Sequence, residues 1–143
     1  MPAFAPVTLA GLAELSGVDV ESIERYQARR LLPGPRPSRG GSGDLAYHEE
    51  HLARLCFIRR ALELGFDLGA VEELVDLDRG SATRSDVHDI ASRRLARLRA
   101  ELAYLQSLES EMARLAASCP RKGPGKDCPI LAGLRPRASP AEA

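Results

Sequence analysis

The apolar positions near the start of the chain follow helical spacing in two short segments. Thr8 suits an N-cap and Ser16-Gly17 is a stop signal. Between them the apolar residues recur three and four apart: Leu9, Leu12, Ala13 and Leu15. Asp19 suits a second N-cap, and the apolar stripe that follows, ending before Pro33, consists of Val20, Ile23, Tyr26 and Leu31. Two short helices joined by a tight glycine turn form the core of a helix-turn-helix.

A segment rich in proline and glycine, residues 33–44, interrupts this pattern. Its three prolines and four glycines exclude a regular helix. The residues that follow, 45–47, can close a β-hairpin wing. Helical spacing returns over about 48–64, ended by Gly65, with these residues on the buried side: Leu52, Leu55, Cys56, Ile58 and Leu62. A further short helix stopping near Gly80 is predicted from Phe66, Leu68, Val71, Leu74 and Val75.

The longest helical pattern runs from Ser85 to Ser118, a stretch without Gly or Pro. Its apolar residues are mostly three and four apart, as in the seam of a coiled coil: Val87, Leu95, Leu98, Leu102, Leu105, Leu108, Met112 and Leu115. A helix about 50 Å long cannot bury such a seam alone in so small a protein. We therefore expect a partner helix, most simply its own copy in an antiparallel or parallel homodimer. The alternative is that the long helix folds back on the N-terminal domain.

The composition restricts the class of protein. No apolar run approaches the roughly 18 residues of a membrane-spanning helix, and the N-terminus lacks the basic region of a signal peptide. We therefore expect a cytoplasmic protein with no membrane partner. A serine–histidine–aspartate set, paired catalytic carboxylates and a phosphate-binding loop are all missing, and the three histidines are scattered, so an enzyme is not expected. The net charge of zero means that any DNA binding must depend on local basic patches.

Two of the three cysteines, Cys119 and Cys128, lie in the Gly/Pro-rich segment CPRKGPGKDCPI that follows the long helix. In a reducing compartment paired cysteines of this kind favour a metal site or redox-active thiols over a structural disulfide. Cys56, in contrast, lies within an apolar helical stripe, where a free cysteine is expected to pack as a small hydrophobe.

Three segments together carry a resemblance to a known family: TLAGLAELSGVDVESIERYQARRLLP, LARLCFIRRALELGFDL, and LQSLESEMARLAASC followed by DCPIL. Their order and separation, from about Val7 to Leu134, resemble the MerR family of bacterial transcription regulators. The implied fold class is all-α with a small β-hairpin wing. It comprises a winged helix-turn-helix domain (1–80), a coiled-coil dimerisation helix (81–118), a metal-binding loop with a short helix (119–134) and a disordered tail (135–143).

The resemblance also implies a mechanism. Family members bind a palindromic promoter operator in double-stranded DNA as a homodimer and, when induced, bend and untwist the DNA so that RNA polymerase can engage it. This is regulation through the energy of DNA deformation. The expected function is a metal-responsive transcriptional activator. The alternative is a regulator of the same fold that senses thiol-reactive or redox stress through Cys119 and Cys128, whose neighbouring basic residues favour a thiolate.

The expected DNA-binding residues lie in the recognition helix, from Asp19 to Arg30, and around the wing. Residues 24–39 hold five arginines and a single acidic residue, a local basic patch suited to phosphate contacts. Two tyrosines match family tyrosines that support or contact the backbone near the helix and the wing. The full set is Thr8, Val20, Ser22, Arg25, Tyr26, Arg29, Arg30, Arg36, Arg39 and Tyr47. This chain departs from the family at Glu24 and Ala46, where arginines are common, so its DNA affinity or sequence preference is expected to differ.

Cys119 and Cys128 match the two loop cysteines of the metal-sensing branch, of the copper, mercury or zinc type. Thiolates select soft ions, and two thiolates on a short loop favour Cu(I), Ag(I) or Au(I), whereas Zn(II), Cd(II) or Hg(II) usually need further ligands. Divalent sensors of the family take a third cysteine from the partner's dimerisation helix, where this chain has Arg84 beside Ser85. His88 of the partner chain, one turn further along, is a possible third ligand. The missing cysteine and the cation in its place favour the monovalent ions.

Overall fold

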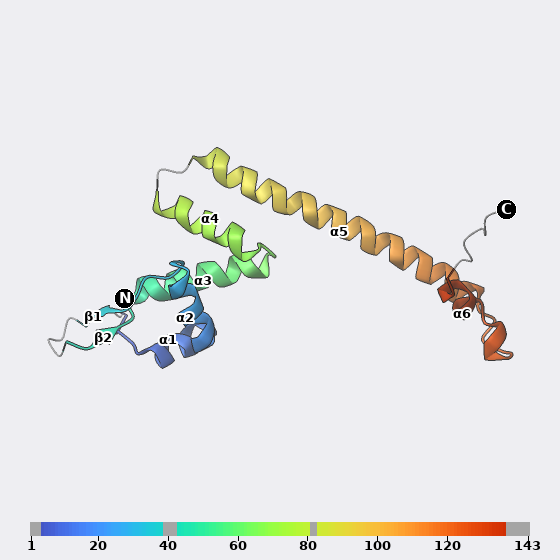
Figure 1. The fold of residues 1–143 in the computed structure, drawn as a ribbon, viewed down its shortest axis with the longest axis horizontal. Helices are drawn as coiled ribbons and strands as arrows, with labels where there is room; N and C mark the ends of the chain where they lie inside the picture. Colours follow the sequence, from blue (N-terminus) through green and yellow to red (C-terminus); the bar gives the residue numbers. More distant parts are fainter. Residues whose placement is uncertain (1–3, 39–42, 81–82, 137–143) are drawn as a thin grey trace. The chain divides into compact units, whose positions relative to one another are not determined.

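The computed structural model describes residues 4–38, 43–80 and 83–136, and within them the chain is mostly helical (Figure 1). The elements in chain order are α1 (Leu9–Ser16), α2 (Val20–Ala28), β1 (Arg36–Pro37), β2 (Leu45–Ala46), α3 (Glu49–Glu63), α4 (Leu68–Arg79), α5 (Arg84–Ser118), the short 3-10 helix η1 (Gly125–Asp127) and α6 (Pro129–Leu134). The chain divides into two compact units, Met1–Arg94 and Leu95–Ala143. The predicted fold class is confirmed.

The helix-turn-helix begins and ends where the capping residues predict. The Thr8 hydroxyl accepts a hydrogen bond from the Gly11 amide at 3.2 Å, and the Asp19 carboxylate accepts one from the Ser22 amide at 2.8 Å. Each bond satisfies an amide that the first helical turn leaves without a backbone partner. Gly17 ends α1 in the left-handed conformation, with φ 69°, which a residue without a side chain adopts without strain.

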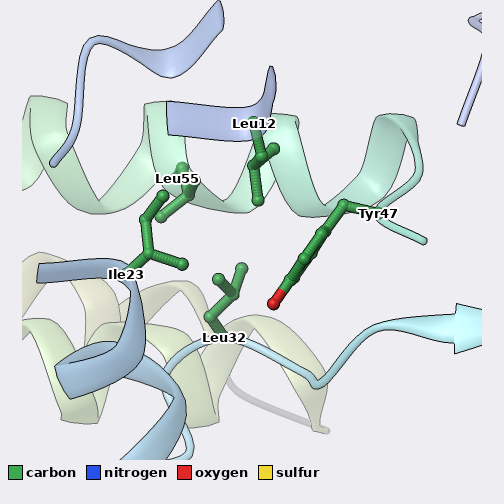
Figure 2. Packing of buried hydrophobic residues seen from close by; sticks show 5 residues of the cluster. All are labelled: Leu12, Ile23, Leu32, Tyr47 and Leu55. Carbon is green, nitrogen blue, oxygen red and sulfur yellow. The ribbon is translucent and has the colours of Figure 1, made fainter. Parts of the chain in front are cut away.

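Two clusters of buried apolar side chains hold the first unit together. The first cluster joins α1, α2 and α3 to the residue that follows β2, Tyr47. Figure 2 shows its side chains pointing toward one another: Leu12, Ile23, Leu32, Tyr47 and Leu55. The second lies between α3 and α4 and contains Leu31, Ile58, Ala61, Val71 and Val75. Tyr26 of α2 packs against both clusters. The recognition helix is therefore fixed to α3 and α4 through the same core.

The predicted wing is present as a short antiparallel hairpin, in which Arg36 pairs with Ala46 and Pro37 with Leu45. The N-terminal segment joins it, since Val7 and Tyr47 exchange two backbone hydrogen bonds of 2.9 and 2.8 Å. His51 connects the wing to α3 from a fully buried position. Its Nδ1 accepts from the His48 amide at 2.9 Å and its Nε2 lies 3.0 Å from the Gly34 carbonyl oxygen, which fits the tautomer protonated at Nε2.

The long helix α5 starts with a complete capping box. The Thr83 amide and hydroxyl both donate to the Asp86 carboxylate, at 3.0 and 2.7 Å, and the Asp86 amide donates back to the Thr83 hydroxyl at 3.2 Å. The first turns of α5 pack on the first unit, because Ile90 is buried and Arg93 pairs with Glu73 of α4 at 3.3 Å. The start of α5 therefore belongs structurally to the winged domain.

The side chain of Cys56 lies at the surface of α3. The prediction that Cys56 packs in the core is wrong, because its side chain is exposed. Leu55 and Ile58 of α3 point into the two clusters, and Cys56 lies about 100° round the helix from Leu55, on the side of Phe57, which is also exposed. The predicted tail lies mostly outside the described residues. Among those that are described, no helix is long and apolar enough to cross a membrane.

Candidate nucleic-acid interface and cysteine loop

The helix α2 presents a polar face opposite its buried one. Ile23 is completely buried, whereas Glu24, Arg25 and the capping residue Arg29 are exposed. Val20, at the first position of the helix, is 38% exposed. Side chains near the N-terminal half and along this face are the ones that a recognition helix can bring to base edges and phosphates.

The arginines expected to contact DNA have acidic partners in the free protein. Arg25 lies 3.3 Å from Glu21, one helical turn earlier in α2. Arg29 lies 3.1 Å from Glu72 of α4. On the wing, Arg36 pairs with Glu50 of α3. All of these side chains are well exposed, so each pair is weak and solvent-screened and can be exchanged for a phosphate.

The remaining predicted DNA-binding residues differ in accessibility. Tyr47 is buried, and its hydroxyl oxygen accepts a hydrogen bond from Gln27 of α2 at 3.0 Å, which gives it a supporting position under the recognition helix. Tyr26 is half-buried between the two clusters. The Thr8 and Ser22 hydroxyls lie at the N-termini of α1 and α2, where Ser22 donates to Asp19 at 2.7 Å. Arg39 lies outside the described residues.

The end of the recognition helix is anchored in a way that the sequence did not indicate. Arg30 adopts a left-handed conformation, with φ 59°, and the chain turns back there into the core residue Leu31. Arg79, at the last position of α4, donates to the Arg30 carbonyl at 3.0 Å and lies 3.5 Å from that of Leu31. These bonds span nearly fifty residues, and no local pattern could have revealed them.

The cysteine loop brings Cys119 and Cys128 together. Cys119 directly follows α5, and its amide donates to the Ala116 carbonyl at 3.2 Å. Cys128 precedes α6, and both thiols are free and half-buried. Hydrogen bonds from the Leu131 and Ile130 amides, with a smaller contribution from the Cys119 side chain, hold the pKa of the Cys128 thiol below its usual value. A lowered pKa increases the fraction of Cys128 that is present as the thiolate, the form that binds metals.

The helix α6 approaches the last turns of α5 at one point beside the loop. A Cβ at Gly133 would lie 2.7 Å from Leu115 Cδ2, so the absence of a side chain lets α6 approach α5 closely. Between the cysteines, Arg121 and Gly123 have positive φ values of 60° and 118° and turn the chain back. These turns allow the chain after Cys119 to return toward the end of α5.

Among the described residues of a single chain, no third metal-binding side chain lies with the two thiols. Nowhere in residues 4–38, 43–80 and 83–136 do three or more His, Cys, Asp or Glu side chains gather closely enough to hold a metal ion. His88 is on the outside of α5, with its side chain 79% exposed and Nδ1 3.3 Å from the Ser92 hydroxyl.

A winged helix-turn-helix whose recognition helix carries exposed arginines, joined to a long helix with an apolar seam, defines a DNA-binding transcription regulator rather than an enzyme. Comparison with family models agrees: residues 7–78 match "MerR HTH family regulatory protein", and residues 52–115 match "MerR, DNA binding". The chain belongs to the MerR family, as its sequence predicts.

Several relatives cover nearly the whole chain. The mercuric resistance operon regulatory protein of Serratia marcescens is 30% identical over 94% of this chain and 91% of its own. The transcriptional regulator CueR of Escherichia coli O157:H7 is 29% identical, covering 90% and 93%. Among solved structures, the regulator PbrR691 of Ralstonia metallidurans CH34 in complex with lead(II) superposes with a TM-score of 0.74 at 29% identity, over 90% of this chain and 99% of that one.

Proposed function

We propose that this chain is a metal-responsive transcriptional activator that binds a palindromic promoter operator as a homodimer and senses a soft metal ion through Cys119 and Cys128. The observation that carries the proposal is the cysteine loop. Two free thiols meet at the end of the long helix, and the local amides favour the thiolate of one of them. The names of the relatives and the lead(II) complex of a structural neighbour support the same class of inducer.

The donor set fits a soft ion. A metal must displace the thiol proton, so the lowered pKa of Cys128 reduces the cost of binding at neutral pH. Thiolates prefer Cu(I), Ag(I) and Au(I), and these ions accept two ligands, which is the number that one loop provides. We therefore favour a monovalent ion. Zn(II), Cd(II) or Hg(II) would need a further ligand, and His88 of the second protomer is the candidate.

The dimer is proposed to form along α5. Six apolar residues of its second part are between 39% and 58% exposed in the single chain: Leu95, Leu98, Leu102, Leu105, Leu108 and Met112. Their spacing places them on one stripe of the helix, and an apolar stripe of this length is stable in water only when another surface covers it. A second copy of α5 supplies a matching stripe.

Metal binding would control transcription by shifting the equilibrium between two dimer shapes. An ion can do this only through its different affinity for the two shapes. The favoured shape would bend and untwist promoter DNA held by α2 and the wing, so that RNA polymerase engages it. In this scheme the winged domain sets where the protein binds, and the loop sets when it acts.

Native mass spectrometry of the reduced dimer tests the metal site directly. We expect stoichiometric uptake of Cu(I) or Ag(I) by the wild-type protein and none by Cys119→Ser or Cys128→Ser, because a hydroxyl binds soft ions far more weakly than a thiolate. Cys56→Ser is the matched control and should bind like wild type. His88→Ala separates the ion classes: it should leave Cu(I) binding unchanged and weaken Zn(II), Cd(II) or Hg(II) only if His88 is a ligand. A dimer that takes up no metal, but whose loop thiols are oxidised together, would support the redox-stress alternative instead.

A further inference from the structure

The ion pair between Arg29, at the end of the recognition helix, and Glu72 of α4 joins a residue expected to contact DNA to a carboxylate of another helix. Their side chains meet at 3.1 Å between Nη1 and Oε1. The two residues are 43 positions apart in the sequence, so the pair depends on the tertiary fold. Glu72 is the least exposed of the carboxylates that pair with the three arginines, at 38%, compared with 86% for Glu21 and 51% for Glu50.

The surrounding structure keeps the two side chains within reach. Arg79, two helical turns after Glu72 in α4, donates to the carbonyl of Arg30, the residue next to Arg29. Val71 and Val75 of α4 lie in the same buried cluster as Leu31. The segment that follows α2, Arg30 and Leu31, is thus held against α4 by the Arg79 hydrogen bond and by apolar packing. The Arg29–Glu72 pair thus lies beside a tertiary contact that keeps its two side chains near each other, while both remain partly exposed and can exchange partners.

We propose that Glu72 is an intramolecular competitor of the DNA phosphate for Arg29, and so limits the affinity of this regulator for DNA. The proposal rests on DNA binding through α2. An arginine contributes to DNA binding by displacing counterions condensed on a phosphate. While Glu72 neutralises Arg29, that contribution is lost. If Arg29 turned to a phosphate and stayed near Glu72, the carboxylate would repel the phosphate. Either geometry makes the Glu72 charge unfavourable for binding.

The variant Glu72→Gln separates this role from a positioning role. Glutamine keeps a side-chain oxygen that can accept the hydrogen bond from Arg29, so it can still orient the guanidinium. It removes only the charge. A competitor predicts tighter DNA binding after this change, whereas a residue that merely orients Arg29 predicts unchanged or weaker binding. Glu73→Gln is the matched control, because Glu73 is the adjacent residue of α4, carries the same charge and pairs with Arg93 of α5 instead.

The experiment measures affinity by fluorescence anisotropy over a series of KCl concentrations. The probes are a duplex that the wild-type protein selects from a random-sequence library and an unselected duplex of equal length. The Glu72→Gln variant should bind both duplexes more tightly, by a factor of about two to five for each protomer in contact with the DNA. This is the range expected for an exposed ion pair. The variant's plot of log K against log salt should be steeper by up to about 0.9 per protomer. Glu73→Gln should show only the smaller effect of the change in net charge.

The double variant Arg29→Gln/Glu72→Gln completes the cycle. In the Arg29→Gln background, Glu72→Gln should give no more gain than Glu73→Gln does. An equal gain with and without Arg29, an equal gain from Glu73→Gln, or weaker binding by Glu72→Gln would overturn the competitor role while leaving DNA binding by α2 intact. Failure of all the proteins, wild type included, to bind either duplex would overturn the proposed function together with this inference.

Discussion

At the scale of single residues, Arg30 has a backbone conformation that arginine rarely adopts. It follows the C-cap of α2 with φ 59°, and the Leu31 amide donates back to the Tyr26 carbonyl at 2.9 Å, the pattern of a Schellman turn. Glycine occupies this position in most such turns because it has no Cβ. We predict that Arg30→Gly raises the free energy of unfolding by about 1 kcal/mol.

Urea denaturation monitored by circular dichroism measures this change. Ala28→Gly, within the right-handed part of α2, is the control, and it should lower stability by about 1 kcal/mol because glycine weakens a helix. If Arg30→Gly destabilised the protein as much as Ala28→Gly, position 30 would not be strained.

Asp19 links the stability of the recognition helix to pH. Hydrogen bonds from the Ser22 hydroxyl and amide lower the pKa of its carboxyl. A group whose pKa is lower in the folded state stabilises the fold above its unfolded pKa and loses that contribution as the pH falls through the folded pKa. Asp19→Ala should therefore lower the melting temperature at pH 7, and the difference from wild type should shrink toward about pH 2.5.

Thermal unfolding at the two pH values tests this prediction. Asp44→Ala, another exposed aspartate but one outside a helix cap, is the comparison and should change stability little at either pH. A deficit of Asp19→Ala that is as large in acid as at neutrality would show that the charge of the cap contributes nothing.

At the scale of elements, the sequence predicted most of the fold because its signals are local. Thr8, Asp19 and Gly17 mark helix ends through their own backbone chemistry, and the apolar spacing of α5 needs no tertiary context. Packing between elements was harder to predict. Cys56 belongs to an apolar stripe in the sequence, but its side chain is exposed. Only some residues of that stripe, such as Leu55 and Ile58, pack into the two buried clusters.

The sequence also indicated only part of the candidate site. The cysteine pair and the arginine-rich recognition helix are visible as sequence patterns, whereas the carboxylates that pair with the arginines are not. Arg29–Glu72 and the Arg79 contact with Arg30 join distant segments. The structural role of the buried His51 was not predicted from the sequence either. His51 lies three residues after the N-cap His48, which is the position of a capping-box partner, and this spacing could have indicated its role.

The recognition helix gives a prediction for the DNA interface. Arg25→Ala should weaken operator binding by about 1–3 kcal/mol with loss of discrimination at one base pair if Arg25 reads a base. If it contacts only phosphate, affinity should fall equally for all sequences and the salt slope should become shallower by about one unit. Anisotropy titrations on matched and altered duplexes distinguish the two. Arg114→Ala, on α5 in the second unit, should have little effect; unchanged binding by Arg25→Ala on every duplex would exclude Arg25 from the interface.

At the scale of the whole molecule, the exposed seam of α5 predicts a dimer. Leu102 is 57% exposed in the single chain, and we expect a second helix to cover it. Leu102→Glu would bury two carboxylates, one from each protomer, at a cost of several kcal/mol each. Analytical ultracentrifugation should show a monomer or an unfolded chain. Ser107→Glu, an exposed polar position on the opposite side of the same helix, should stay dimeric. A folded dimer of Leu102→Glu would place the interface elsewhere.

In the proposed mechanism, a soft metal ion bound by the cysteine loop activates transcription while the dimer stays bound to its DNA site. In vitro transcription by bacterial RNA polymerase tests it most directly, on a promoter that carries the site selected by the wild-type protein, across a panel of metal ions. We expect Cu(I) or Ag(I) to activate transcription with the wild-type protein. Neither Cys119→Ser nor Cys128→Ser should activate it, although footprinting should show both variants bound to the site at wild-type affinity. Full metal-dependent activation by a protein without the two loop cysteines would exclude them as the metal sensor.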